Sequence, residues 1–201
     1  MRVPHDRIEV DGSPLGKAPP VYLAMNKPRG IVTTASDEKG RETVYDLLDP
    51  GLPWVSPVGR LDKASEGLLL LTNDSEWAAK IAEPVSHLEK KYHVQVDCVA
   101  DDRLISKLIQ RTADGVEDLG AKFATLLRRG DKTSWIEITL DEGKNRQIRR
   151  LLQAQEIGVL RLVRVSIGPL ALGHLKKRQV RELTVDEKKA LDQALRIAAR
   201  R

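Results

Sequence analysis

The sequence predicts an α+β protein with a mixed β-sheet and helices packed around it. Strand-like and helix-like segments follow one another without an internal repeat, and without the regular strand–helix–strand order of a parallel fold. The most apolar run, four leucines at 68–71, lies between Gly67 and a Thr-Asn-Asp turn. Such a run is typical of a strand buried on both faces. Residues 91–99 alternate between apolar and polar side chains, as in a strand with one buried face.

The elements before the leucine run are short. An Asp-Gly pair at 11–12 predicts a turn, and the proline-containing stretch that follows predicts a connector. In the stretch NKPRG, the asparagine, proline and glycine predict a turn that points Lys27 and Arg29 outward. We therefore expect strands at 6–10, 21–25 and 31–35, and a short helix at 43–48 that the following Asp-Pro-Gly ends.

The elements after the leucine run alternate between helices and strands. Asn73 or Ser75 is expected to cap the first helix, and Pro84 to end it. Thr184 and Glu187 form the T-x-x-E pattern of a capping box, which predicts the start of the last helix. We expect helices at 73–84, 101–110 and from 184, and strands at 121–127, 134–140, 159–172 and 179–183.

Composition favours a polyanionic partner in a reducing compartment. The formal net charge is +5 and the pI is about 9.3, a balance that mildly favours nucleic acid. The single cysteine, Cys98, excludes an intramolecular disulfide framework, fits a cytoplasmic location, and is expected to be a buried apolar side chain. No apolar stretch is long enough to span a membrane, and the N-terminus has no apolar signal region.

Several kinds of catalytic site are absent from the sequence. There is neither a G-x-x-x-x-G-K-[ST] loop nor a G-x-G-x-x-G loop, so a nucleotide cofactor lacks its usual cradle. The four histidines have no zinc-site spacing, and no G-x-S-x-G motif indicates a hydrolase. We expect no cofactor and no metal.

Asp62 is the first candidate site residue, because it lies just before the leucine strand. Most loop aspartates cap a turn, and this is one interpretation. The other is that Asp62 lines a cleft with the leucine strand as its floor. A poorly solvated carboxylate there would need a cation to stay ionised.

The arginine-rich stretch EGKNRQIRRLLQAQ offers such cations. With Asn145 as a possible N-cap, its apolar residues fall on one helical face and Arg146 and Arg150 on the opposite face. Arg149 borders the apolar stripe, where its head group would need an anion. The alternative for the three arginines is a solvated basic face. Lys144 and Arg146, at the start of the helix, form a candidate phosphate site.

Tyr92 is the third candidate. It opens the apolar face of the alternating strand, which it shares with Val94, Val96 and Cys98. It is either a core tyrosine with its hydroxyl at the rim or a residue of the cleft.

Four stretches resemble, in order, the motifs of pseudouridine synthases of the RsuA/RluB/RluE/RluF group. The motifs are matched by MNKPRGIVTT, by GRLDKASEGLLLLTND, by the lysine–tyrosine strand KYHVQV, and by EGKNRQIRRLL with RLVRVSIGPLAL. Ser65 stands where many members have threonine, and HLKKRQVRELT lacks a glycine often found there. Because four motifs agree in order and spacing, the resemblance is specific.

The resemblance implies a fold and an architecture. Residues 21–201 would form the catalytic domain, with a mixed, mostly antiparallel sheet, flanking helices and a central active-site cleft. Residues 1–20 would be an N-terminal strand and connector, resembling only the end of the segment that follows the S4-type domain of many members. The chain would then be most like the short RluE type.

The resemblance also implies an activity: isomerisation of a specific uridine to pseudouridine in ribosomal RNA. Large-subunit 23S RNA is favoured over small-subunit RNA, and the protein is expected to be a cytoplasmic monomer without a membrane partner. Asp62 would be the catalytic carboxylate, Arg149 the arginine paired with it, and Tyr92 the tyrosine that packs against the target base. RNA phosphates are expected at Lys27, Arg29, Arg41, Arg60, Lys144 and Arg146. The alternative is a non-catalytic RNA-binding or ribosome-assembly protein with the same fold.

Overall fold

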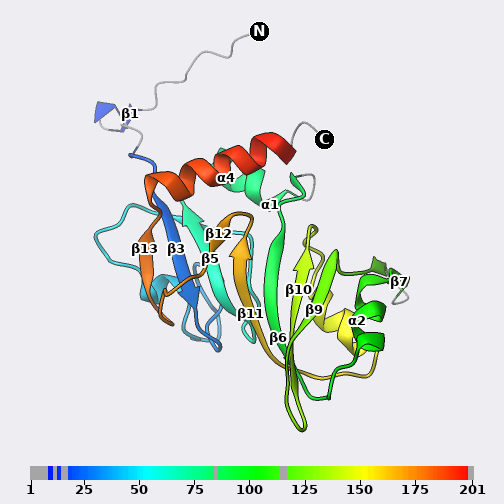
Figure 1. Ribbon diagram of the computed structural model, residues 1–201. Helices are drawn as coiled ribbons and strands as arrows, with labels where there is room; N and C mark the ends of the chain where they lie inside the picture. The colour runs from blue at the N-terminus through cyan, green and yellow to red at the C-terminus, as the bar shows by residue number, and fades with distance from the viewer. Residues whose placement is uncertain (1–8, 11–12, 15–17, 84–85, 114–116, 199–201) are drawn as a thin grey trace.

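The computed structural model describes residues 9–10, 13–14, 18–83, 86–113 and 117–198, and a nine-stranded sheet runs through it (Figure 1). All pairings between the described strands of this sheet are antiparallel, except that of β5 with β11. Seven strands follow one another across it, in the order β13 (Val180–Glu182), β3 (Tyr22–Lys27), β5 (Glu66–Thr72), β11 (Val159–Ile167), β6 (Lys90–Val96), β10 (Ser134–Leu140) and β9 (Phe123–Arg129). The mixed, mostly antiparallel sheet is as expected.

The remaining elements flank this sheet. Figure 1 shows α1 and α4 together at one end of it, and α2 beside β9 and β10 at the other. Two short strands extend it, since β4 (Ser56–Val58) pairs with β5 and β12 (Leu170–Ala171) with β11. The helices are α1 (Ser75–Ala82), α2 (Asp102–Ile109), α3 (Gln147–Gln153), α4 (Val185–Ala198) and the 3-10 helix η1 (Val44–Leu47). Two separate pairs are β1 (Glu9–Val10) with β2 (Ser13–Pro14), and β7 (Thr112–Ala113) with β8 (Asp118–Leu119).

Strand β5 is buried on both faces, as its leucine run predicts. Every one of its residues is buried. Leu68 and Leu70 pack into the cluster that contains side chains of α1 and α4, whereas Leu69 and Leu71 pack into a cluster on the opposite face. Burying a leucine fully contributes about 1.5–3 kcal/mol, so this strand anchors both halves of the core.

Strands β6, β9 and β10 pack against α2 and α3. Their apolar side chains form a third core cluster, in which Val94 and Val96 are fully buried. His93 and Gln95, on the other face of β6, are partly exposed. The alternation expected for β6 is therefore confirmed. Cys98 follows the strand and is partly buried against the same cluster.

The capping residues predicted for the helices are confirmed in part. Thr184 and Glu187 exchange the two hydrogen bonds of a capping box, as expected. The cap of α1 is Asp74, which accepts from the Trp77 amide, and not Asn73 or Ser75. Asn73 instead binds the backbone before β3, and this long-range pairing leaves the next residue to cap the helix. The expected helix end at Pro84 lies outside the described residues.

The expected strand at 31–35 is wrong. Only Val32 forms a bridge, to Thr43, and the neighbouring Thr33 hydroxyl donates to the Leu61 carbonyl instead of extending a ladder. The short helix expected at 43–48 is present as η1, capped by Thr43. Of the strand expected at 6–10, residues 6–8 lie outside the described part of the chain, and 9–10 form β1. Within the described residues, no helix combines the length and the apolar character needed to cross a membrane.

Candidate active site

Asp62 lies in the turn that joins β4 to β5, and hydrogen bonds to the backbone carbonyl groups hold this turn. The Ser65 amide donates to the Asp62 carbonyl at 2.9 Å. The Lys27 ammonium donates to the same carbonyl at 3.1 Å and to the Ser65 carbonyl at 2.9 Å. With both ends of the turn fixed, the Asp62 carboxylate is held in one place while its side chain stays 37% exposed.

Lys27 corrects one sequence-based expectation. It was expected to point outward and bind RNA, but it is fully buried, and its third hydrogen bond goes to the Pro28 carbonyl at 3.2 Å. Strand β3 continues through Lys27, opposite Gly67 in β5, so the side chain lies beneath the Asp62 turn. Burial lowers the pKa of Lys27 to about 8, against the opposing effect of Asp62. Its role is structural.

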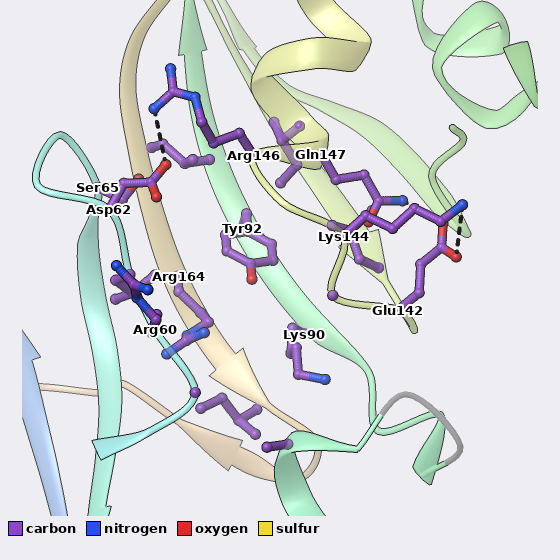
Figure 2. A pocket seen from close by; sticks show the side chains of 18 of the residues that line it. Arg60, Asp62, Ser65, Lys90, Tyr92, Glu142, Lys144, Arg146, Gln147 and Arg164 are labelled. Carbon is purple, nitrogen blue, oxygen red and sulfur yellow. Dashed lines mark hydrogen bonds and ion pairs between the residues drawn. The ribbon is translucent and has the colours of Figure 1, made fainter. Parts of the chain in front are cut away.

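The carboxylate of Asp62 pairs with Arg146, as Figure 2 shows. The Arg146 Nη1 donates to Oδ2 of Asp62 at 3.2 Å, and the arginine side chain is 51% exposed. Pairs this exposed contribute little to stability, so the contact mainly orients the carboxylate. Arg146 is the N-cap of α3, with a left-handed backbone (φ 48°), and not Asn145 as expected.

The prediction that Arg149 pairs directly with Asp62 is wrong. Its Nη2 donates to the Ala64 carbonyl at 3.1 Å, so it grips the Asp62 turn through the backbone. Burial, followed by the nearby Arg146, lowers the pKa of Arg149, while Asp62 acts to raise it. Arg146, just before the first residue of α3, therefore contacts the Asp62 carboxylate. Arg149, one turn further along the helix, contacts the backbone of the turn that carries Asp62.

A cavity of about 180 Å³ opens beside Asp62, with Tyr92 on its wall (Figure 2). Tyr92 comes from β6, is half-buried, and packs at the margin of two core clusters. Much of the wall is apolar, contributed by Val58, Ile81, Leu140, Ile148, Leu162 and Ile167. The site therefore combines a solvated carboxylate at the rim with a drier interior.

Two cations of the interior were missed by the sequence analysis. Lys90 lies two residues before Tyr92, on the same face of β6, and Arg164 lies opposite Tyr92 in β11. Arg164 is 4% exposed and its Nε donates to the Leu68 carbonyl at 2.7 Å. Burial, then Arg164, lowers the pKa of Lys90 to about 8, with Asp141 opposing. Extending the two-residue period of β6 back to Lys90 would have found the first of them.

The other basic residues expected to bind RNA are divided between the cavity and its surroundings. Lys144 lines the cavity and donates to the Asp118 carbonyl at 2.6 Å. Arg60 lines both the cavity and a neighbouring groove on the other side of Asp62, which also contains Arg41. Arg41 is held by Asp37, whose pKa it lowers strongly. The exposed Arg29 lies apart from both and donates to the Leu160 carbonyl at 3.4 Å.

The chemistry available at this site is that of a carboxylate beside a partly apolar pocket. In the described part of the chain, no group of three or more His, Cys, Asp or Glu side chains is placed to hold a metal ion. The cavity wall combines an aromatic ring, aliphatic side chains and the donors of Lys90 and Arg164, features that suit a flat ring with carbonyl oxygens. The carboxylate at the rim is placed to act on whatever carries that ring.

Comparison with known proteins agrees with this geometry. The family model for RNA pseudouridylate synthase matches residues 21–154. A protein of Bacillus subtilis (strain 168) named ribosomal large subunit pseudouridine synthase B is 37% identical over 188 residues, which cover 92% of this chain and 77% of that protein. A protein of the same name from Xylella fastidiosa (strain Temecula1 / ATCC 700964) is also 37% identical, over 96% of this chain but 43% of its own length. These names do not confirm the expected likeness to the short RluE type.

Solved structures agree as well. A crystal structure titled as a pseudouridylate synthase superposes with a TM-score of 0.75 at 29% identity, covering 86% of this chain and 74% of that one. A structure titled as an H/ACA RNP bound to a substrate RNA containing 2′-deoxyuridine superposes with a TM-score of 0.55 at 15% identity. At that identity the second likeness shows the fold alone.

Proposed function

The chain belongs to the RNA pseudouridylate synthase family, and from this premise we propose that it converts one uridine of large-subunit ribosomal RNA to pseudouridine. The observation that carries the proposal is the Asp62 carboxylate, held at the rim of a cavity that also contains Tyr92. The names of the Bacillus and Xylella relatives support the large-subunit RNA as substrate.

The reaction is an isomerisation. The N1–C1′ bond of uridine breaks, the uracil turns within the pocket, and C5 bonds to C1′. Neither electrons nor external energy are consumed, so the residues of the site can carry the reaction themselves. Asp62 acts at the sugar, either by attack on C1′ or by removal of the C2′ proton. Both routes need an ionised carboxylate beside a pocket that keeps water from the freed base.

The neighbouring residues have separate tasks in this proposal. Tyr92 packs against the uracil, since its half-buried ring forms part of the cavity wall. Arg146 orients the Asp62 carboxylate through its ion pair. Arg149 holds the Ala64 carbonyl, and thereby the turn that carries the carboxylate.

RNA binding is assigned to the basic residues around the cavity. The uridine has to leave its stack to reach Asp62, so the flanking phosphates must lie along the surface beside the cavity. Arg60, Lys144 and Arg146 line the cavity, and Arg41 extends the basic surface into the neighbouring groove. Arg29 belongs to the same proposal through its exposed position. Neutralising one of these residues is expected to flatten the salt dependence of RNA affinity.

The setting of the protein is also a proposal. We propose that residues 21–201 act as the catalytic domain, which the family match beginning at residue 21 supports. We further propose a cytoplasmic monomer, since the chain has a single cysteine and the relatives named above are enzymes of ribosomal RNA.

The proposal is tested by mapping pseudouridines in ribosomal RNA from a strain that lacks the gene. Carbodiimide labelling and primer extension locate each pseudouridine, and the strain is complemented with wild type or with Asp62→Asn. We expect one pseudouridine of large-subunit RNA to disappear and to return only with wild type. A site that changes in small-subunit RNA would correct the substrate, and no change in any ribosomal RNA would contradict the proposal.

A further inference from the structure

The cavity is lined by two cations, Lys90 and Arg164, that form no ion pair with any residue that the structure describes. In the part of the chain that the structure describes, Nη2 of the buried Arg164 has no hydrogen-bond partner. No hydrogen bond or ion pair joins the Lys90 ammonium to any other described residue. Figure 2 shows both side chains on the side of the cavity toward which the Tyr92 hydroxyl points. The free donor of the buried Arg164, together with the partly buried ammonium of Lys90, indicates that a ligand supplies the acceptors.

The carboxylates nearest the cavity are already engaged with other groups. Asp62 pairs with Arg146 at the rim, and Glu142 pairs with Lys144 at 3.4 Å. Asp141, the carboxylate that acts on Lys90, forms its ion pair with Lys122 at 3.7 Å. Burying a cation without a counter-charge is unfavourable, and natural sites retain such an arrangement where a ligand completes it. The missing partner is therefore a group with electron-rich oxygens or a negative charge.

We propose that Lys90 and Arg164 bind the carbonyl oxygens of the uracil base and hold its negative charge after the glycosidic bond breaks. This inference rests on the proposed function, because the ligand is the base of the target uridine. The lowered pKa of Lys90 supports it, since the ammonium is poorly solvated until an anion arrives.

The charge that needs stabilisation follows from the reaction. When the N1–C1′ bond breaks, its electron pair leaves with N1, and the negative charge spreads over O2 and O4 of the uracil. This holds whether Asp62 bonds to C1′ or removes the C2′ proton. After the base turns, C5 bonds to C1′. On the first route the Asp62–C1′ bond breaks and its electron pair returns to the carboxylate, and on the second route C2′ takes back the proton that Asp62 removed. C5 then loses its proton, and N1 gains one. The base is thus anionic only between the two steps, which is when two fixed cations lower the barrier.

The surroundings of the two cations favour a base over a phosphate. The cavity wall includes the Tyr92 ring and aliphatic side chains such as Leu140 and Leu162. A flat ring can pack on these surfaces, whereas a phosphate has no apolar face to bury. The exposed Arg146 and Arg60, at the rim, are better placed for the RNA backbone.

The test compares Lys90→Met with Lys91→Met in the full-length protein. Lys91 is the next residue of β6 and pairs with Glu137 on the opposite face of the sheet, so it is a matched control. Ribosomal RNA from the deletion strain is the substrate, and pseudouridine is counted under single-turnover conditions with enzyme in excess. We expect Lys90→Met to slow the reaction by about 10²-fold, as for the loss of one charge-stabilising donor. RNA affinity should be unchanged, and Lys91→Met should react like wild type.

Three readouts separate this inference from its competitors. Because Lys90 has no described partner to lose, the melting temperature of Lys90→Met should not fall. If the melting temperature does fall, Lys90→Gln, which keeps a hydrogen-bond donor but not the charge, is used in place of Lys90→Met. A weaker RNA affinity with a flatter salt dependence would assign Lys90 to a phosphate and overturn the inference. A single-turnover rate equal to that of Lys91→Met would overturn it too, with the proposed function intact.

Failure of the proposed function is recognised separately. If wild type forms no pseudouridine in ribosomal RNA, the same three proteins are titrated with free uracil by NMR. Binding by wild type and Lys91→Met, with loss in Lys90→Met, would still support a uracil site. Equal binding by all three, or none by any, would overturn it.

Discussion

Gly67 is the position where the sheet that supports the site tolerates the least change. Its φ is +102°, and a Cβ added there would lie 2.3 Å from the carbonyl oxygen and 2.7 Å from the amide nitrogen of Arg164. Both are backbone atoms of β11, which pairs with β5 in parallel at this residue, so they cannot move without separating the strands. The positive φ costs about 1–2 kcal/mol, and forced overpacking about 1–3 kcal/mol. Gly67→Ala should therefore lower the free energy of unfolding by about 2–5 kcal/mol, out of the 5–15 typical of a domain.

Urea unfolding, followed by tryptophan fluorescence, measures this loss. Gly40→Ala is the control, because Gly40 also has a positive φ (+64°) but no atom within 4 Å of the added Cβ. It should show only the backbone cost of about 1–2 kcal/mol. If Gly67→Ala is no less stable than Gly40→Ala, the close approach of β5 and β11 is not what requires the glycine.

Three further perturbations test other parts of the account. Lys27→Met leaves three carbonyl groups without their donor. The free energy of unfolding should fall by about 1–3 kcal/mol, which a lower melting temperature would show. A normal melting temperature with weaker RNA binding would instead restore the interpretation of Lys27 as an RNA contact. Arg181 lowers the pKa of Glu187 from 4.5 to about 2. A carboxyl group whose pKa is lowered by folding stabilises the folded state at pH values above its pKa in the unfolded chain, and this stabilisation is lost as the pH falls toward 2. The difference in melting temperature between wild type and Glu187→Gln should thus be largest near neutral pH and vanish by pH 2, and a constant difference would refute this. Because burial lowers the pKa of Lys90 to about 8, the single-turnover rate should fall as pH rises through 8, and Lys90→Arg should move that fall to higher pH; a fall unmoved by the substitution belongs to another group.

Much of the sheet could be predicted from local patterns. The leucine run identified β5 as buried on both faces, and the alternation after Lys91 identified the buried face of β6. These patterns succeed because burial on a given face is repeated along several residues. The segment 31–35 misled because its apolar and β-branched residues resemble a strand. Its hydrogen bonds instead go to the Leu61 carbonyl and to the backbones of Glu42 and Val44.

The site was harder to predict, because it depends on long-range pairing. The motif placed Asp62 and Tyr92 beside one cavity, and the structure has them there. Lys27 was misplaced because the turn signals in NKPRG conceal the fact that β3 continues through the lysine. The cations Lys90 and Arg164 come from strands far apart in sequence, and only the register of β6 with β11 brings them together.

The central claim is that the Asp62 carboxylate carries out the isomerisation. The most direct measurement is the single-turnover rate of pseudouridine formation by purified wild type, Asp62→Asn and Asp131→Asn, on ribosomal RNA from the deletion strain. Asp131 lies in the exposed turn between β9 and β10 and serves as the control. The account predicts no product with Asp62→Asn at an unchanged melting temperature, and a wild-type rate with Asp131→Asn. Product formation by Asp62→Asn at the wild-type rate would contradict it.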